Sequence, residues 1–232
     1  MNAPAVIFTH PPDYAKAAMA TLAAKRCGLN VTWVIDQADT AEGIPPSIPI
    51  VRSVSNRNGN LRGLEWISEQ LAIMASVGAG HEWLIKIDSD TLIDRLDWLE
   101  SAADHHHLVG TFIGHGEPLP PRLFGGCYAI RSNQIERTRQ RVGAMTIGPC
   151  ENEDRIIGMQ FSADEIHEHP FNPDRGMMAG WIWNDSSTRE NLFSRFSVIT
   201  VHPDDRVPVI TQRDETERCM RYLIADLLTH PR

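Results

Sequence analysis

Short apolar runs alternate with helix-period segments along the first half of the chain. Apolar runs rich in β-branched residues at 5–9, 31–35 and 83–87 are typical of buried strands. An alanine-rich segment at 14–26, with Asp13 in position to cap it, predicts a helix between the first two runs. A strand, a helix and a second strand at this spacing form a βαβ unit, so we expect a parallel sheet with a right-handed crossover.

Weaker patterns continue this alternation through the second half. Apolar positions at helical spacing predict a helix over 61–77. Further helices are expected at 94–103, at 132–142, within 151–161 and after a capping-box pattern at Thr211–Asp214, and further strands at 50–54, 108–113, 124–130, 181–183 and 198–201. Together these elements predict an α/β fold in one domain, 1–232, built as a three-layer α/β/α sandwich with a mostly parallel central sheet.

Composition narrows the class of protein. Of the 232 residues, 42% are hydrophobic and 22% are charged, which is typical of a soluble globular chain. No apolar run approaches the roughly 20 residues of a membrane helix and no secretory signal opens the chain, so we expect a cytoplasmic protein. A formal net charge of −8 argues against sequence-independent nucleic-acid binding, which depends on Lys and Arg. A small phosphorylated ligand remains compatible with this charge if a cation is bound with it.

The four cysteines give neither a zinc signature nor a dense disulfide framework. Cys27, Cys127, Cys150 and Cys219 are far apart and form no Cys-x-x-Cys pair. Reduced thiols are therefore expected, although Cys127 and Cys150 could meet in space and the sequence leaves that pairing open.

Two aspartates, Asp88 and Asp90, stand one residue apart directly after the apolar run at 83–87. In extended chain, residues i and i+2 point to the same face, so both carboxylates can aim at one point. Two like charges there repel each other unless a cation offsets them, and a hard divalent ion with oxygen ligands is the natural partner. The alternative is an ordinary Asp-Ser-Asp turn at the end of a strand.

Four motifs occur in an order that resembles the GT-A family of nucleotide-sugar-dependent glycosyltransferases. They are Trp83–Thr91 with its Asp-x-Asp, Phe124–Ile130 with its Gly-Gly-x-Tyr, Cys150–Gly158 with its Glu-Asp pair, and Val201–Pro203 with a strand-end histidine. The likeness is greatest to the β-galactosyltransferase and fringe-like branch. It implies a GT-A-like domain with a nucleotide-sugar-binding half, 1–93, and an acceptor-binding half, 94–232.

This resemblance implies a metal-dependent, inverting glycosyltransferase. The donor would be a nucleotide diphosphate sugar, with a UDP-sugar expected, and the acceptor a hydroxyl of a saccharide or another molecule. Asp88, Asp90 and His202 would bind Mn²⁺, or alternatively Mg²⁺, with Asp88 near the metal or the ribose. Asp154 would be the general base, with Glu153 as the fallback. The alternative for His202 is an ordinary solvent-exposed histidine at the end of a strand. The alternative for Glu153 and Asp154 is an acidic first turn that stabilises the N-terminus of a helix.

Substrate-binding residues are expected at strand ends, at a helix start and around the glycine pair. Donor contacts are assigned to Thr9, Asp36, Asn58, Arg62 and Asp88, and acceptor contacts to Gly125, Gly126, Trp181 and Trp183. Arg62 is equally typical of a solvated helix residue, and alternating tryptophans in a strand are more often core packing.

Two other functions remain as alternatives. A nucleotidyltransferase also uses carboxylates and a divalent ion on an α/β sheet, but the segment at 9–13 lacks the glycine-rich basic loop expected there. A non-catalytic nucleotide-sugar-binding protein would keep the fold without turnover. The histidines at 105–107 and at 167 and 169 suggest a second metal site, but we interpret them as loop or strand-edge residues, because consecutive residues alternate sides in a strand.

Overall fold

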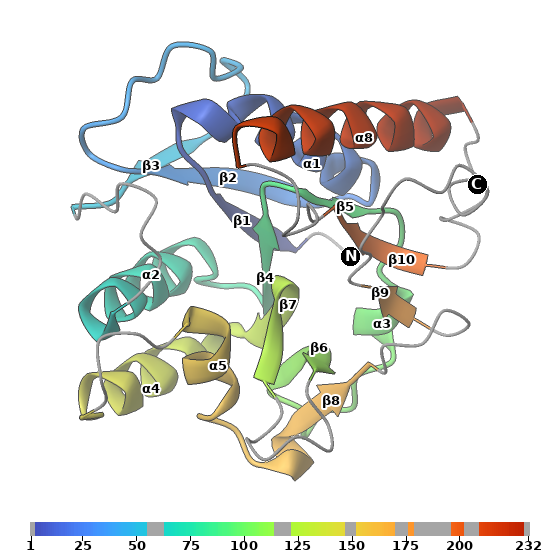
Figure 1. Ribbon diagram of the computed structural model, residues 1–232. Coiled ribbons are helices and arrows are strands. Elements are labelled where there is room, and N and C mark those ends of the chain that lie inside the picture. Colours follow the sequence, from blue (N-terminus) through green and yellow to red (C-terminus); the bar gives the residue numbers. More distant parts are fainter. Residues whose placement is uncertain are drawn as a thin grey trace.

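Figure 1 shows the chain as a computed structural model, which describes residues 3–54, 63–113, 122–146, 152–169, 176–178, 196–201 and 209–229. A seven-stranded sheet lies at its centre. The strands are β1 (Pro4–Phe8), β2 (Asn30–Ile35), β3 (Ile50–Arg52), β4 (Trp83–Asp88), β6 (Leu108–Ile113), β7 (Arg122–Arg131) and β8 (Ile166–Glu168). Their order is β3-β2-β1-β4-β7-β6-β8. Only the two pairings of β7 are antiparallel, which confirms the mostly parallel sheet.

Helices cover both faces of this sheet. α1 (Tyr14–Arg26) and α8 (Val209–Thr229) lie on one face, and α2 (Leu64–Val77), α4 (Ser132–Gly143) and α5 (Glu153–Gly158) lie on the other (Figure 1). Strand side chains alternate between the two cores. Ala5 and Ile7 of β1 pack on the α1 side, whereas Val6 packs on the α2 side. The predicted three-layer α/β/α sandwich is confirmed.

A second, smaller sheet brings a late strand to the end of β4. It contains β5 (Thr91–Ile93), β10 (Phe196–Thr200) and β9 (Gly176–Met178), in the order β5-β10-β9. β5 and β10 are antiparallel, and Thr200 pairs with Thr91. Because β5 follows β4 after a two-residue turn, this pairing holds β10 beside the Asp-x-Asp motif.

Several predicted helix boundaries differ from the structure. Asp13 occupies the N-cap position of α1, but its carboxylate pairs with Lys16 at 3.0 Å and makes no capping hydrogen bond. The helix expected at 94–103 shortens to α3 (Asp97–Glu100), because the amides of Asp94 and Arg95 bond to the carbonyl oxygen of Ser197 in β10. α8 begins at Val209, upstream of the predicted capping box.

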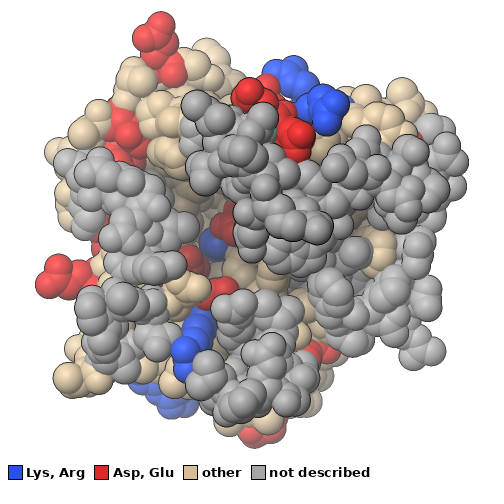
Figure 2. Space-filling model, viewed as in Figure 1, with Lys and Arg blue, Asp and Glu red and all other residues tan. Residues whose placement is uncertain are grey.

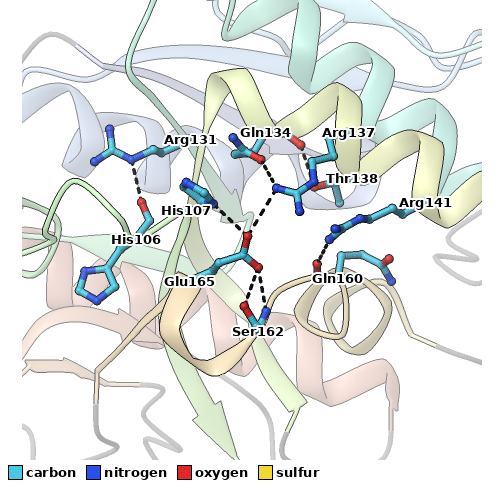
Figure 3. A network of polar contacts seen from close by, with 10 residues as sticks. All are labelled: His106, His107, Arg131, Gln134, Arg137, Thr138, Arg141, Gln160, Ser162 and Glu165. Carbon is cyan, nitrogen blue, oxygen red and sulfur yellow. Dashed lines mark hydrogen bonds and ion pairs between the residues drawn. The ribbon is translucent and has the colours of Figure 1, made fainter.

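A polar network fastens the connection between α5 and β8 (Figure 3). The Glu165 carboxylate accepts hydrogen bonds from the amide and hydroxyl of Ser162, at 2.9 and 2.8 Å. His107 Nδ1 and Arg137 Nη1 lie 3.3 and 3.4 Å from its other oxygen. These partners, the Ser162 groups first, lower the pKa of Glu165 to about 2.

No helix among the described residues is long and apolar enough to cross a membrane.

Candidate functional site

The Asp-x-Asp motif forms the turn at the end of β4. β4 ends at Asp88, Ser89 and Asp90 make a two-residue turn, and β5 begins at Thr91. The expectation that both carboxylates share one face of an extended strand is therefore wrong, and the turn alternative describes the backbone. The two acids still lie close enough to interact electrostatically. The pKa of Asp88 is raised to about 7, chiefly by the partial burial of its side chain, with the charge of Lys86 opposing this and that of Asp90 adding to it.

Lys86 is a member of the site that the sequence interpretation missed. Its side chain lies on the same face of β4 as Asp88, and its Nζ donates to Asp88 Oδ1 at 2.5 Å. Nζ also donates to the carbonyl oxygen of Gly125 at 2.6 Å and lies 3.9 Å from Glu153 Oε2. Burial alone would lower the pKa of Lys86, but the charges of Asp88 and Glu153 outweigh it and raise the pKa. The signal was a single lysine inside an otherwise apolar strand.

The first turn of α5 adds two more acids. Glu153 is buried and accepts a hydrogen bond from the Tyr128 hydroxyl at 2.6 Å. Burial, followed by the charge of Glu153, raises the pKa of Tyr128 well above its ordinary value, so the phenol stays a donor. Asp154 is half-buried and its Oδ1 accepts the amide hydrogen of Arg155 at 2.8 Å. Of the two candidate bases, Glu153 is committed to internal partners and Asp154 is the more accessible.

The glycine pair of β7 lies between these acids and the small sheet. A Cβ on Gly125 would stand 3.4 Å from Asp154 Oδ2, so Gly125 and Asp154 are in contact distance. A Cβ on Gly126 would come 2.4 Å from Thr200 Oγ1 and 2.5 Å from the Phe124 ring. The space next to Gly126 is thus filled by the side chains of Thr200 and Phe124. Acceptor binding at Gly125 and Gly126 stays a prediction.

β10 ends beside the acidic turn. The Thr91 and Thr200 hydroxyls are 2.8 Å apart, and the amide of Val201 donates to the carbonyl oxygen of Asp90 at 2.9 Å. Val201, which bonds to Asp90, directly precedes His202 in the sequence, and His202 itself lies outside the described residues.

The predicted donor residues Thr9 and Asp36 lie at the same edge of the large sheet. Phe8 pairs with Val34 of β2 and with Asp88 of β4, so the carboxyl ends of three parallel strands are level. Since neighbouring strands lie about 4.8 Å apart, β2 and β4 are separated by roughly 10 Å at this edge. Thr9 and Asp36 are both buried.

Arg52 supports this edge, although the sequence gave no reason to select it. Its Nη1 donates to the carbonyl oxygens of Asp36, Gln37 and Asp39 at 3.2, 3.1 and 2.9 Å. The Tyr14 hydroxyl donates to the carbonyl oxygen of Thr40 at 2.7 Å. These bonds fix the loop after β2, which carries Asp36.

Other predicted residues cannot be placed. Asn58, Arg62, Trp181, Trp183 and His202 lie outside the described residues. Cys150 does too, whereas Cys127 is a buried free thiol whose pKa is raised by burial.

The acids at the end of β4 have the donor chemistry of a divalent-cation site. Carboxylate oxygens suit Mn²⁺ and Mg²⁺, and a cation would relieve the repulsion that Asp88 receives from Asp90. Within the described ranges no three His, Cys, Asp or Glu side chains are grouped to hold a metal ion. Asp88 and Asp90 therefore fit as two ligands that need a third from elsewhere. Figure 2 shows acidic and basic side chains together in a recess near the middle of the visible face.

The two histidine stretches meet in space, far along the sheet from this site. The ring centroids of His105 and His106 are 4.1 Å apart, those of His106 and His167 4.8 Å, and those of His167 and His169 4.7 Å. The rings are tilted or edge-on to one another, and among the described residues no three His, Cys, Asp or Glu side chains are grouped to hold a metal ion.

No protein-family model and no curated protein sequence matches the chain, but solved structures match its fold. A glycosyltransferase involved in the glycosylation of the major capsid of PBCV-1 aligns with a TM-score of 0.58 and 9% identity, over 96% of this chain and 100% of that one. The apo form of glycosyltransferase GlyE from Streptococcus pneumoniae TIGR4 aligns with a TM-score of 0.57 and 10% identity, over 99% of this chain and 64% of that one. Galactosyltransferase LgtC, in complex with donor and acceptor sugar analogs, aligns with a TM-score of 0.54 and 13% identity, over 98% and 97% of the two chains.

These matches show that the chain has a fold that glycosyltransferases use, as the motifs implied. They do not single out the fringe-like branch.

Proposed function

We propose that this chain is a glycosyltransferase that moves a sugar from a nucleotide diphosphate donor, a UDP-sugar, to a hydroxyl group of a saccharide or another acceptor. One observation carries the proposal: a fold shared with glycosyltransferases places Asp88, Glu153 and Asp154 around Lys86 at one end of β4, with Asp90 close enough to interact with Asp88. Like charges that gather repel one another and lose hydration, so a cluster of acids with perturbed pKa values is a candidate functional site.

Residues 1–93 would bind the donor and residues 94–232 the acceptor. On the donor side, Thr9 and Asp36 follow two parallel strands at the edge where ligands bind in α/β sheets. Asn58 and Arg62 would meet the diphosphate. On the acceptor side, the backbone at Gly125 and Gly126, with Trp181 and Trp183, would receive the acceptor.

Asp88, Asp90 and His202 would hold Mn²⁺ or Mg²⁺. The contact of Val201 with Asp90 supports His202 as the third ligand. A divalent cation, when bound, neutralises charge on the leaving diphosphate.

Asp154 would take the proton of the acceptor hydroxyl. The hydroxyl oxygen forms a bond to the anomeric carbon, the bond from that carbon to the diphosphate oxygen breaks, and its electron pair leaves with the nucleotide diphosphate. A displacement of this kind inverts the anomeric configuration. The accessible position of Asp154 beside Gly125 supports this role over Glu153, which is occupied by Tyr128 and Lys86.

The first experiment is a panel of nucleotide sugars, screened with and without Mn²⁺ by thermal shift. A ligand that binds only the folded state raises the melting temperature, so we expect a UDP-sugar to do so in the presence of Mn²⁺. If no nucleotide or nucleotide sugar shifts the melting temperature, the proposed donor is wrong. The donor found in this way is then incubated with candidate acceptors, and analysis of the products identifies the acceptor.

Asp154→Asn tests the base. Loss of a positioned base typically costs about 10²- to 10⁴-fold in turnover, whereas donor binding should be unchanged. Asp164→Asn, at an exposed acid beyond α5, is the matched control and should keep full turnover. A wild type that binds UDP and Mn²⁺ without any transfer would favour a non-catalytic binding protein. A product that retains the configuration of the donor sugar would remove Asp154 from this role while leaving sugar transfer intact.

A further inference from the structure

The proposed reaction leaves one buried charge of the site without a task, the ammonium group of Lys86. Its side chain is only 4% exposed, in the middle of β4. Removing an ammonium group from water is strongly unfavourable unless partners replace the lost hydration. The neighbouring positions of this strand are hydrophobic, so the presence of a buried lysine here calls for a functional or structural explanation.

Three elements converge on this ammonium group. Asp88 Oδ1 belongs to β4, the carbonyl oxygen of Gly125 to β7, and Glu153 Oε2 to α5, at 2.5, 2.6 and 3.9 Å from Nζ. Two of the three N–H donors of the ammonium group are hydrogen-bonded, to Asp88 and to Gly125, and Glu153 lies farther away as an ion-pair partner. Nζ also lies over the Tyr128 ring, 5.7 Å from its centroid, and the Tyr128 hydroxyl donates to Glu153.

This arrangement fixes how Asp88 meets a ligand. Its Oδ1 is taken by Lys86, while its side chain keeps 37% of its surface exposed, so Oδ2 is the oxygen left for a ligand. The same ammonium group holds Gly125, against which Asp154 lies. One side chain thus connects the donor-side acid to the neighbour of the proposed base.

We propose that Lys86 is a positioning residue for sugar transfer, which orients Asp88 toward the cation and diphosphate of the donor and sets the place of β7 and α5 relative to β4. The inference rests on the proposed function. It differs from a purely structural role, in which Lys86 would serve only to neutralise buried Glu153.

Three variants separate these roles: Lys86→Met, Glu153→Gln and the double variant Lys86→Met/Glu153→Gln. Met has a similar length and no charge, but alone it leaves Glu153 buried without its cation, so the single variant risks unfolding. The double variant removes both charges, and Gln still offers an oxygen to the Tyr128 hydroxyl. Glu153→Gln is the matched reference, because it differs from the double variant only at position 86.

The readout is binding rather than turnover. Free Mn²⁺ is titrated by electron paramagnetic resonance, with and without UDP, after circular dichroism has shown that each variant is folded. We expect the double variant to bind Mn²⁺ with UDP about 10-fold or more weakly than Glu153→Gln, the range seen when residues that orient metal ligands are removed. Where transfer is measurable, the KM for the donor should rise.

Equal affinities in the double variant and in Glu153→Gln would overturn the proposal and leave the transferase function standing. A double variant that does not fold would assign Lys86 to core stability and also overturn it. A wild type that binds neither Mn²⁺ nor UDP would instead remove the proposed function, and this inference with it.

Discussion

Position 126 has room for a hydrogen atom but not for a methyl group. A Cβ there would stand 2.4 Å from Thr200 Oγ1 and 2.5 Å from the Phe124 ring, well inside van der Waals contact. Gly126→Ala should therefore push β10 away from β7 and destabilise the fold by about 1–3 kcal/mol, the usual cost of overpacking. Urea unfolding of the variant and the wild type measures the difference.

Gly143→Ala is the matched control for this substitution. Gly143 ends α4, and a Cβ there meets nothing within 4 Å. Its stability should be unchanged or slightly raised, because alanine is the better helix former. Equal free energies of unfolding for the two variants would show that β10 can shift without cost.

At the scale of residues, the sequence revealed the acids but not what surrounds them. Asp88, Asp90 and Asp154 were selected because they follow apolar runs or match a motif. Lys86 was missed because its partners, Gly125 and Glu153, are 39 and 67 positions away along the chain. Arg52 was missed for a related reason, since its task is to hold main-chain oxygens after another strand.

At the scale of elements, the row of histidines joins the loop before β6 to β8. His106 Nδ1 accepts the amide hydrogen of Ala103 at 2.9 Å, and His167 Nε2 is 3.0 Å from the Ser101 hydroxyl. His169 Nε2 is 2.7 Å from the carbonyl oxygen of Trp98. Neutral imidazoles can pack against one another in this way, whereas protonated rings at such separations repel one another.

The pKa values of these histidines are lowered in the folded protein. Burial is the first cause for His106, His167 and His169. Charge on neighbouring groups adds to it, from His105, His167, Arg131 and His107 around His106 and from His169 beside His167, whereas the Trp98 carbonyl and Asp97 oppose it at His169.

Acid should therefore weaken the fold through this cluster. The unfolded chain binds more protons below its ordinary histidine pKa of 6.5, so the free energy of unfolding falls as the pH drops below 6.5, and the loss is complete below the folded pKa values. His106→Gln/His167→Gln should flatten this pH dependence, as measured by urea unfolding between pH 8 and pH 5. Asp88 contributes with the opposite sign, because its pKa of about 7 lies above its ordinary 3.8, but it is common to both proteins.

The exposed His81→Gln is the control and should leave the pH dependence of the wild type unchanged. An identical pH dependence in the double variant and the wild type would show that protonation does not disturb the packing of these rings.

The sequence predicted well those elements that have a clear apolar pattern of their own. α1 and β6 match their expected bounds, and β1, β2, β4 and α4 differ from theirs by one residue at one or both ends. β8, with three residues, was missed, because hydrogen bonds to β6 rather than its own apolar pattern make it a strand. β9, equally short, was missed for the same reason.

At the scale of the whole molecule, residues 1–93 and residues 94–232 share one sheet. β4, from the first half, pairs with β7 from the second over Trp83–Ile87, and β5 pairs with β10. Calorimetry should therefore show one cooperative transition, with equal calorimetric and van't Hoff enthalpies. Residues 1–93 expressed alone should not fold, because β4 would lose its β7 partner. Two separate transitions, or a folded 1–93 fragment, would contradict this view.

The partners Thr91 and Thr200 stand 109 positions apart in the chain. A ribosome that adds roughly 5–20 residues per second needs about 5 to 20 s to cross that interval. During this time the nascent polypeptide already carries the acidic turn but not the strand that closes it. The acidic turn therefore gains its β10 partner only after the strands of the large sheet have been synthesised.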